Sequence, residues 1–193
     1  MKPRGVSAAV AVAFMWFGVT ASLPAGEVTV KGVHLCCDGC VSAVEDAMEM
    51  AKAVTSLECD VNAKTVSFSV PDEKAGKAAV QALAKGGFFG KAIHDGKELP
   101  FPDNGARKGA KSDTVTITGM HLCCDACVNG AQKALEKVDR LTTTEFDRAK
   151  GTVRLIGQQI EAKHVLILLN KAGFYGRVGT KKKRQPSDGR GRR

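Results

Sequence analysis

The feature that most constrains this chain is an internal repeat. The segment GVHLCCDGCV at 32–41 returns as GMHLCCDACV at 119–128, with eight of its ten letters unchanged. Further matches continue along both segments: Glu58 with Glu145, Asp60 with Asp147, and, after one deleted residue, Phe88 with Phe174. A repeat of this length in a chain of 193 residues predicts two similar small domains rather than one large domain.

The hydrophobic pattern within each repeat predicts a βαββαβ order. Alternating apolar and polar residues predict a first strand at EVTVKGV and at DTVTITGM. The cysteine loop then opens a helix, a hairpin follows, and a second helix spans about 73–85 and 159–171, with a short last strand beginning at Phe88 or Phe174. The predicted fold class is therefore α+β, with two tandem ferredoxin-like βαββαβ domains after a signal peptide.

The ends of the chain and the segment between the repeats differ from the repeats in composition. Residues 1–25 carry Lys2 and Arg4 before an uncharged run and small residues, which is the layout of a secretory signal peptide. The uncharged run would extend only about 21 Å as a helix, short of the roughly 30 Å hydrocarbon core of a membrane. We therefore expect export to the periplasm or the cell exterior, with an uncleaved N-terminal membrane anchor as the alternative.

Composition also sets the other expected boundaries. The first domain is expected at 26–95, the second at 113–178, and a linker with prolines, glycines and many charges at 96–112. Residues 179–193 are rich in Lys and Arg and read as a disordered basic tail.

The net charge of +9 says little about the folded part of the chain, because residues 26–176 contain 19 basic and 19 acidic groups. A nucleic-acid partner would need aromatic platforms or a recognition helix beside the charge, and the sequence shows neither. The basic tail is expected to be a solvated end, and the alternative is contact with an anionic envelope surface.

Each repeat places a CxxC motif, Cys37 with Cys40 and Cys124 with Cys127, between a strand and the start of a helix. A helix N-terminus lowers the pKa of a nearby thiol, and the resulting thiolate is both a nucleophile and a metal ligand. Sites made of sulfur alone select Cu(I), Zn(II) and other soft ions. A redox pair is the alternative for such a motif. Structural disulfides are a third possibility, although seven cysteines cannot all pair within one chain.

With these motifs the chain resembles two tandem heavy-metal-associated domains, the module of copper chaperones, copper-pump N-terminal domains and periplasmic mercury-binding proteins. The resemblance covers about 27–94 and 113–178 and rests on the strand–CxxC–helix order, the hairpin turns ECDVNAKTV and EFDRAKGTV, and the late Gly-Phe pairs. It implies the ferredoxin-like fold and one soft ion, often Cu(I), held by each CxxC pair. It also implies that Phe88 and Phe174 pack close to the metal loops.

The cysteine loops depart from the family's G-M-x-C-x-x-C pattern by two added residues. Leu35 and Leu122 therefore stand where the family has a buried methionine. The insertion adds candidate ligands to each site: Cys36, Cys123, His34 and His121. A third sulfur and a nitrogen would favour three- or four-coordinate binding and admit Zn(II). The alternatives are a surface position for the histidines and a small buried residue for the added cysteines.

Several single residues have plainer interpretations. Cys59, which is replaced by Phe146 in the second repeat, is expected to pack in the core. The remaining expectations are hairpin turns shaped by Asp60 and Asp147, helix caps at Asp38 and Asp125, and surface positions for His94 and His164.

The sequence thus predicts an exported heavy-metal-binding protein, and not an enzyme, that captures, buffers or transfers soft ions. Cu(I) is the favoured ion, with Zn(II) and Hg(II) as alternatives. Each cysteine cluster is expected to be a separate site, and tandem copies would raise capacity. The expected partner is a metal-transporting membrane protein or another metal-binding domain. The alternative functions are thiol–disulfide exchange by the same cysteines, and an interaction module whose clusters are disulfide-bonded.

Overall fold

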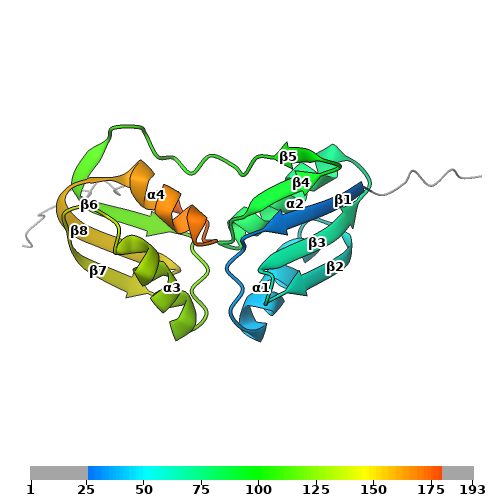
Figure 1. The fold of residues 1–193 in the computed structure, drawn as a ribbon, viewed down its shortest axis with the longest axis horizontal. Coiled ribbons are helices and arrows are strands. Elements are labelled where there is room, and N and C mark those ends of the chain that lie inside the picture. Colours follow the sequence, from blue (N-terminus) through cyan, green and yellow to red (C-terminus); the bar gives the residue numbers. More distant parts are fainter. Residues whose placement is uncertain (1–25, 180–193) are drawn as a thin grey trace, which may run out of the picture.

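The computed structural model describes residues 26–179 and folds them into two units that lie side by side (Figure 1). The first unit contains, in chain order, β1 (Gly26–Lys31), α1 (Asp38–Glu49), β2 (Thr55–Asp60), β3 (Thr65–Val70), α2 (Glu73–Lys85), β4 (Lys91–His94) and β5 (Lys97–Leu99). The second contains β6 (Lys111–Thr118), α3 (Asp125–Leu135), β7 (Leu141–Asp147), β8 (Thr152–Glu161), α4 (Ala162–Lys171) and β9 (Arg177–Val178).

Each unit is an antiparallel sheet with two helices. The strand order is β2-β3-β1-β4-β5 in the first unit and β7-β8-β6-β9 in the second. Without β5 the two orders are equivalent, and both are those of a ferredoxin-like βαββαβ unit. The predicted fold class, α+β with two tandem ferredoxin-like units, is confirmed.

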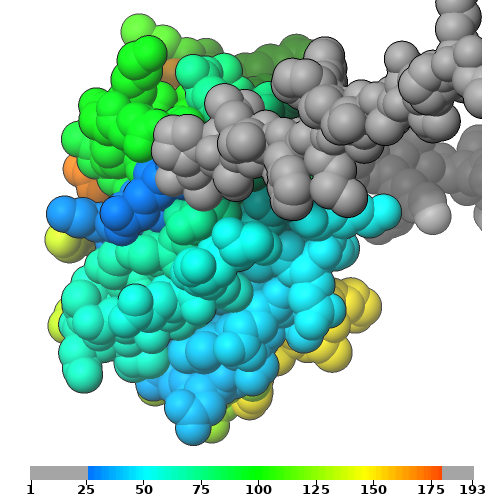
Figure 2. Space-filling view, turned by 90° about the vertical axis from the view of Figure 1, so that its right-hand side faces the viewer, coloured from blue at the N-terminus to red at the C-terminus, as the bar shows by residue number. Residues whose placement is uncertain are grey.

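The alternating pattern of the strands builds the core of each unit. Val28 and Val30 of β1 are fully buried, and they pair across the sheet with Phe68 and Val66 of β3. The intervening residue Thr29 is only half-buried. Strand β6 repeats the arrangement in the second unit, with Val115 and Ile117 buried. Figure 2 shows the first unit from the side away from the second, whose yellow segments emerge only at its edges.

Three features of the fold differ from the sequence prediction. Strand β8 runs on to Glu161, so α4 begins at Ala162 rather than near 159, and Gln159 in the strand has a positive φ of 55°. The last strands begin later than predicted, at Lys91 and Arg177, because Phe88 and Phe174 instead form an isolated antiparallel bridge with each other. Strand β5 occupies part of the expected linker, where it pairs with β4.

The surface position predicted for His94 is wrong. The residue ends β4 on the inward face, pairs with Val28 and is 8% exposed. The sequence analysis missed this because β4 has only four residues, too few for a clear alternation. His164 is exposed, as expected.

The predicted role of Asp60 and Asp147 is confirmed. The Asp60 carboxylate accepts hydrogen bonds from the backbone N–H groups of Asn62 and Ala63, both at 2.8 Å. Asp147 accepts one from the backbone N–H of Lys150 at 3.1 Å. These bonds close the hairpin turns.

None of the helices within 26–179 is long and apolar enough to cross a membrane. The predicted signal peptide and all but the first residue of the predicted basic tail lie outside the described residues.

Candidate metal centre

The two units meet through matching loops that follow α2 and α4. The backbone N–H of Tyr175 donates to the Gly87 carbonyl at 2.9 Å, and that of Phe89 donates to the Gly173 carbonyl at 3.0 Å. The backbone N–H of His34, in the first cysteine loop, donates to Gly173 as well, at 3.3 Å. Because equivalent residues of the two repeats pair with each other, the units are related by an approximate two-fold axis.

Glycine is required where these loops touch. Gly87 and Gly173 have φ values of 86° and 88°, a region that residues with a side chain rarely adopt. A Cβ on Gly173 would also collide with the backbone N of His34, and one on Gly87 with the backbone N of His121. Gly87 and Gly173 therefore allow the backbone of each unit to contact the cysteine loop of the other.

The histidines of the cysteine loops stack across this interface. The His34 ring lies on Phe174, with ring centroids 4.1 Å apart, and the His121 ring lies on Phe88 at 4.5 Å. Both phenylalanines are 1% exposed. Proximity of each phenylalanine to a metal loop was implied by the family resemblance, but each one contacts the loop of the other unit.

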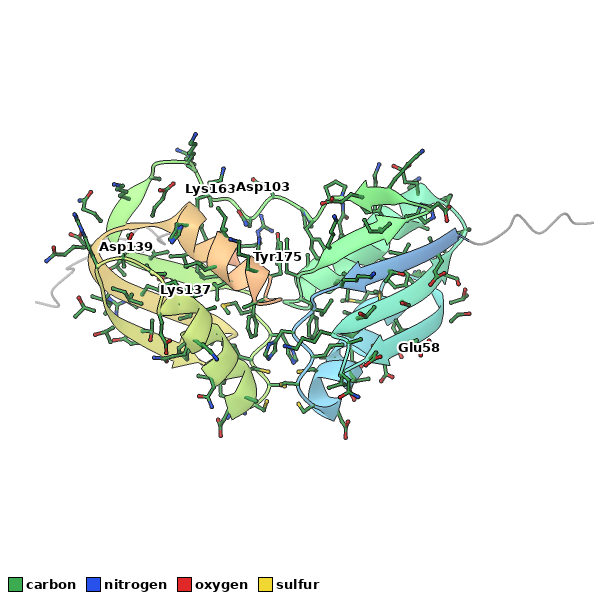
Figure 3. The ribbon with its side chains drawn as sticks, viewed as in Figure 1. Glu58, Asp103, Lys137, Asp139, Lys163 and Tyr175 are labelled. Carbon is green, nitrogen blue, oxygen red and sulfur yellow. The ribbon has the colours of Figure 1, made fainter. Side chains whose placement is uncertain are left out.

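This reciprocal docking brings the two cysteine clusters into one group, which we call the six-sulfur centre: the Sγ atoms of Cys36, Cys37, Cys40, Cys123, Cys124 and Cys127. Cys36 Sγ lies 3.5 Å from Cys40 Sγ in its own unit and 3.6 Å from both Cys124 Sγ and Cys127 Sγ in the other. Figure 3 shows sulfur atoms between the lower ends of α1 and α3. The sequence interpretation treated the two clusters as separate sites, but in the structure their sulfurs lie together.

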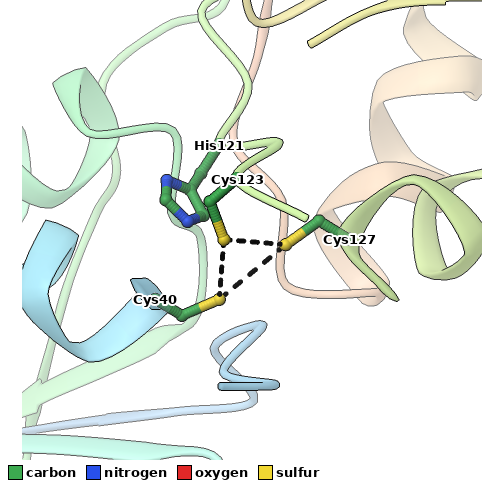
Figure 4. Close-up of side chains that lie close together, drawn as sticks. All are labelled: Cys40, His121, Cys123 and Cys127. Atoms are coloured by element: carbon green, nitrogen blue, oxygen red, sulfur yellow. Dashed lines mark hydrogen bonds between the residues drawn. The ribbon is translucent and has the colours of Figure 1, made fainter. Parts of the chain in front are cut away.

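Figure 4 shows one triangle of the centre, in which two sulfurs of the second unit meet one of the first. Cys40 Sγ lies 3.7 Å from Cys123 Sγ and 3.8 Å from Cys127 Sγ, and the last two are 3.5 Å apart. All seven cysteines are free, although six of their sulfurs lie within 4.0 Å of at least three others.

The helix starts hold the sulfurs in place. The N-cap residues of α1 and α3 are Cys37 and Cys124, each with an extended backbone and no side-chain capping bond. The helices then begin at Asp38 and Asp125, so the expected capping by these aspartates is wrong. Asp125 instead accepts a hydrogen bond from Arg148 at 2.8 Å. Uncapped N-termini carry partial positive charge, which stabilises thiolates beside them.

Buried apolar residues anchor the loops that carry the sulfurs. Leu35 and Leu122, which the resemblance placed at the position of a buried methionine, are 2% and 4% exposed. Val33 and Met120, one residue before the histidines, are buried as well. The two added residues of each loop therefore bring extra ligand candidates to the centre without losing the apolar anchor.

The thiol environments differ within the centre. A hydrogen bond from the backbone N–H of Cys127 lowers the pKa of Cys124 to about 6. Burial opposes ionisation of Cys40, but hydrogen bonds from the backbone of Cys36 and from neighbouring thiols outweigh it and lower the pKa. Burial, followed by hydrogen bonds to the other sulfurs, raises the pKa of Cys36 and of Cys123. The centre thus combines thiols that ionise more readily with thiols that ionise less readily, and a metal ion must displace the protons of the latter.

The histidines are placed to add nitrogen ligands. The ligand atoms of His121, Cys40, Cys123 and Cys127 all lie within 4.8 Å of one another, and those of His34, Cys36 and Cys127 do likewise. The Nε2 atoms of both rings are buried without a hydrogen-bond partner. Burial lowers the pKa of His34 to about 4 and also lowers that of His121, so both rings are neutral near pH 7, the form that binds a metal. A set of three cysteines and one histidine suits tetrahedral Zn(II).

One side of the centre is open to solvent. Cys123 is exposed, and it lies in the wall of a surface pocket of about 320 Å³ that also includes Lys85, Arg148 and Lys150. Cys40 and Cys127 are buried. Cys123 is therefore a sulfur that an incoming ligand can reach from solvent, and Cys36, Cys37 and Cys124 are partly exposed as well.

The seventh cysteine lies outside the centre. Cys59 is partly buried, packs against the core, and shows no contact with the six sulfurs. Burial raises the pKa of its thiol to about 11. The structure agrees with the packing role expected for it, and Cys59 provides an internal control for experiments on the other six.

Comparison with known proteins supports the resemblance read from the motifs. No protein-family profile matches the chain. The chain is 24% identical over 155 residues to heavy metal-associated isoprenylated plant protein 8 of Arabidopsis thaliana, an alignment that covers 79% of this chain and 63% of that protein. The predicted resemblance to heavy-metal-associated proteins is confirmed by this similarity.

Among solved structures, the N-terminal soluble domains of Bacillus subtilis CopA match with 17% identity and a TM-score of 0.31, over 81% of this chain and 95% of theirs. The strand order and the similarity to the Arabidopsis protein define the class: a tandem ferredoxin-like protein similar to the heavy-metal-associated proteins.

Proposed function

We propose that this protein captures, buffers or transfers soft metal ions through the six-sulfur centre, with Cu(I) as the favoured ion. The observation that carries the proposal is the convergence of six cysteine sulfurs from two repeats to separations of 3.5–4.0 Å. Sulfur donors select soft ions, and a dense group of them suits Cu(I) in particular. The ion is cargo rather than a resident cofactor, and no catalytic turnover is involved.

Two further observations support metal transfer. The Arabidopsis relative is named as a heavy metal-associated protein. The exposed Cys123 provides a point at which a sulfur of a partner can attack a bound ion before a resident sulfur leaves. Transfer by such ligand exchange needs no conformational step, and it would proceed from the exposed edge of the centre to the buried sulfurs.

The site of action proposed is the periplasm or the cell exterior, with residues 1–25 as a cleaved signal peptide. The proposed partners are a metal-transporting membrane protein or another metal-binding domain. Expressing the chain with and without residues 1–25 and fractionating the cells tests the localisation. Equal amounts of both forms outside the cytoplasm would contradict a role for this segment in export.

The metal proposal is tested with the mature chain, purified without oxygen and fully reduced. Cu(I), Hg(II) and Zn(II) are each titrated against competing chelators, and bound metal per chain is measured. The comparison is between a variant with all six centre cysteines changed to serine and the matched Cys59→Ser control. We expect tight Cu(I) binding by the wild type and the control, and none by the six-serine variant. No tight binding by fully reduced wild type would overturn the proposal and favour thiol–disulfide exchange.

A further inference from the structure

The sulfur–sulfur contacts of the six-sulfur centre are arranged as the edges of an octahedron. Its three pairs of opposite corners are Cys36 with Cys123, Cys37 with Cys127, and Cys40 with Cys124, and no contact joins the two members of any such pair. Every edge between other corners is 4.0 Å or shorter, except Cys123 to Cys124.

The faces of this octahedron have the size of a metal–thiolate triangle. Six of the eight faces have three edges of 3.5–4.0 Å, and the other two share the edge from Cys123 to Cys124. An ion at the centre of one of the six faces would lie about 2.0–2.3 Å from each sulfur, close to the roughly 2.3 Å of a zinc–thiolate bond. When ions occupy alternate faces, each ion has three sulfurs and each sulfur bridges two ions. The six sulfurs then accommodate about four ions, with no sulfur left over.

We propose that the six-sulfur centre holds one polynuclear Cu(I)–thiolate cluster of about four ions, shared by both units, rather than two separate single-ion sites. The proposal rests on the proposed function and specifies its ligand. Three-sulfur faces favour Cu(I), which accepts two or three thiolates, whereas Zn(II) takes four ligands in a tetrahedron. Forming the cluster releases the thiol protons, so six thiolates and four Cu(I) ions leave a net charge of about −2.

The surroundings suit a small anionic cluster. The uncapped N-termini of α1 and α3 have Cys37 and Cys124, two of the corners, as their N-cap residues, and they place partial positive charge on both sides of the cluster. The stacked pairs of His34 with Phe174 and His121 with Phe88 lie beside the sulfurs. Most faces combine sulfurs of both units, so most ions would join the two repeats.

The first test measures the cluster in the reduced mature chain. Cu(I) is titrated against a competing chelator, bound copper is counted by native mass spectrometry, and Cu···Cu scattering is sought by X-ray absorption. We expect about four Cu(I) per monomeric chain, cooperative filling, and Cu···Cu scattering. A limit of two ions per chain, filled independently and without Cu···Cu scattering, would overturn the shared cluster while leaving the proposed function intact. No tight binding at all would overturn both.

The second test uses substitutions in one unit only. Two separate sites predict that the double variant Cys37→Ser/Cys40→Ser keeps half of the copper, held by the unchanged second unit. The shared cluster predicts loss of more than half of the copper and of the Cu···Cu signal, with the same result for Cys124→Ser/Cys127→Ser. Cys59→Ser, which lies outside the centre, should bind copper as the wild type does, and circular dichroism checks that each variant is folded. Retention of half of the copper in both folded double variants would contradict the proposal.

Discussion

At the scale of single residues, the role of Gly173 is decided by what lies against it. The residue combines a positive φ with a backbone-to-backbone contact to His34, whereas Gly105 in the linker has a φ of 76° and nothing within 4 Å of a Cβ position. We expect Gly173→Ala to lower the free energy of unfolding by at least about 2 kcal/mol more than Gly105→Ala does. Both substitutions strain the backbone, but only Gly173→Ala separates the units. Thermal and urea unfolding of the two variants measures the difference, and equal losses would contradict the contact.

The two histidines can act as ligands or as stacking partners, and substitution separates these roles. Phenylalanine at both positions keeps an aromatic ring over Phe174 and Phe88 but removes the nitrogen. If sulfur alone binds Cu(I), the His34→Phe/His121→Phe variant should bind the same number of Cu(I) ions as the wild type. Its Zn(II) affinity should fall by about tenfold or more, because the set of three cysteines and His121 loses a ligand. Chelator competition with each metal gives the number of bound Cu(I) ions and the Zn(II) affinity. A large loss of bound copper would show that the histidine rings are copper ligands.

At the scale of elements, the four long helices start in two different ways. Helix α2 has a side-chain cap, since the Asp72 carboxylate accepts a hydrogen bond from the backbone N–H of Ala75 at 2.7 Å. Helices α1 and α3, which begin at the cysteines, have none. The sequence suggested aspartate caps at the two cysteine loops, but there Cys37 and Cys124 occupy the N-cap positions without a side-chain capping bond, which leaves the helix N–H groups to the thiolates.

The cap of α2 gives a prediction about stability alone. Asp72→Ala should lower the free energy of unfolding by about 1 kcal/mol, because one N–H group of the first turn loses its partner. Lys74→Ala, an exposed change in the same turn, should have little effect. Urea unfolding compares the two, and copper binding should be unchanged in both variants because α2 contributes no sulfur. A Lys74→Ala loss as large as that of Asp72→Ala would contradict the assigned cap.

At the scale of the whole molecule, the shared centre ties two units that the chain joins only by a linker. The Tyr175 hydroxyl donates to the carbonyls of Pro102 and Asp103, which holds part of this linker against the second unit (Figure 3). Residues 107–110 are exposed. Cleavage at a protease site placed there would break the covalent connection between the units and leave only the non-covalent contacts to hold them together.

Cleavage at that site should leave the two halves associated more tightly with Cu(I) than without it. The reason is mass action: ions bound by sulfurs of both units stabilise the associated state. We expect the dissociation constant of the cut halves to fall by at least tenfold on copper loading, measured by size-exclusion chromatography at several concentrations. The same cut in the Cys37→Ser/Cys40→Ser variant is the control. An unchanged dissociation constant on loading the wild type would indicate that each unit binds copper by itself.

Much of this protein follows from its sequence alone. The repeat, the alternation of Val28 and Val30, and the turns at Asp60 and Asp147 are local signals, and they determine two ferredoxin-like units with a cysteine loop at the start of a helix in each. The ligand candidates were also evident, because residue type and spacing decide which side chains can bind a soft ion. The shortness of β4 concealed the burial of His94, and the extension of β8 through Gln159 had no sequence signal.

Only the tertiary structure decides that there is one centre rather than two. Contacts such as those of Gly173 with His34, Phe88 with His121 and Cys36 with Cys124 join residues more than 30 positions apart, and their geometry depends on how two folded units dock. Hydrophobic periodicity describes the face that a strand or helix buries in its own unit, and it carries no information on the orientation of a second unit. The sequence therefore determines the number of sulfurs, whereas their convergence depends on the interface between the two units.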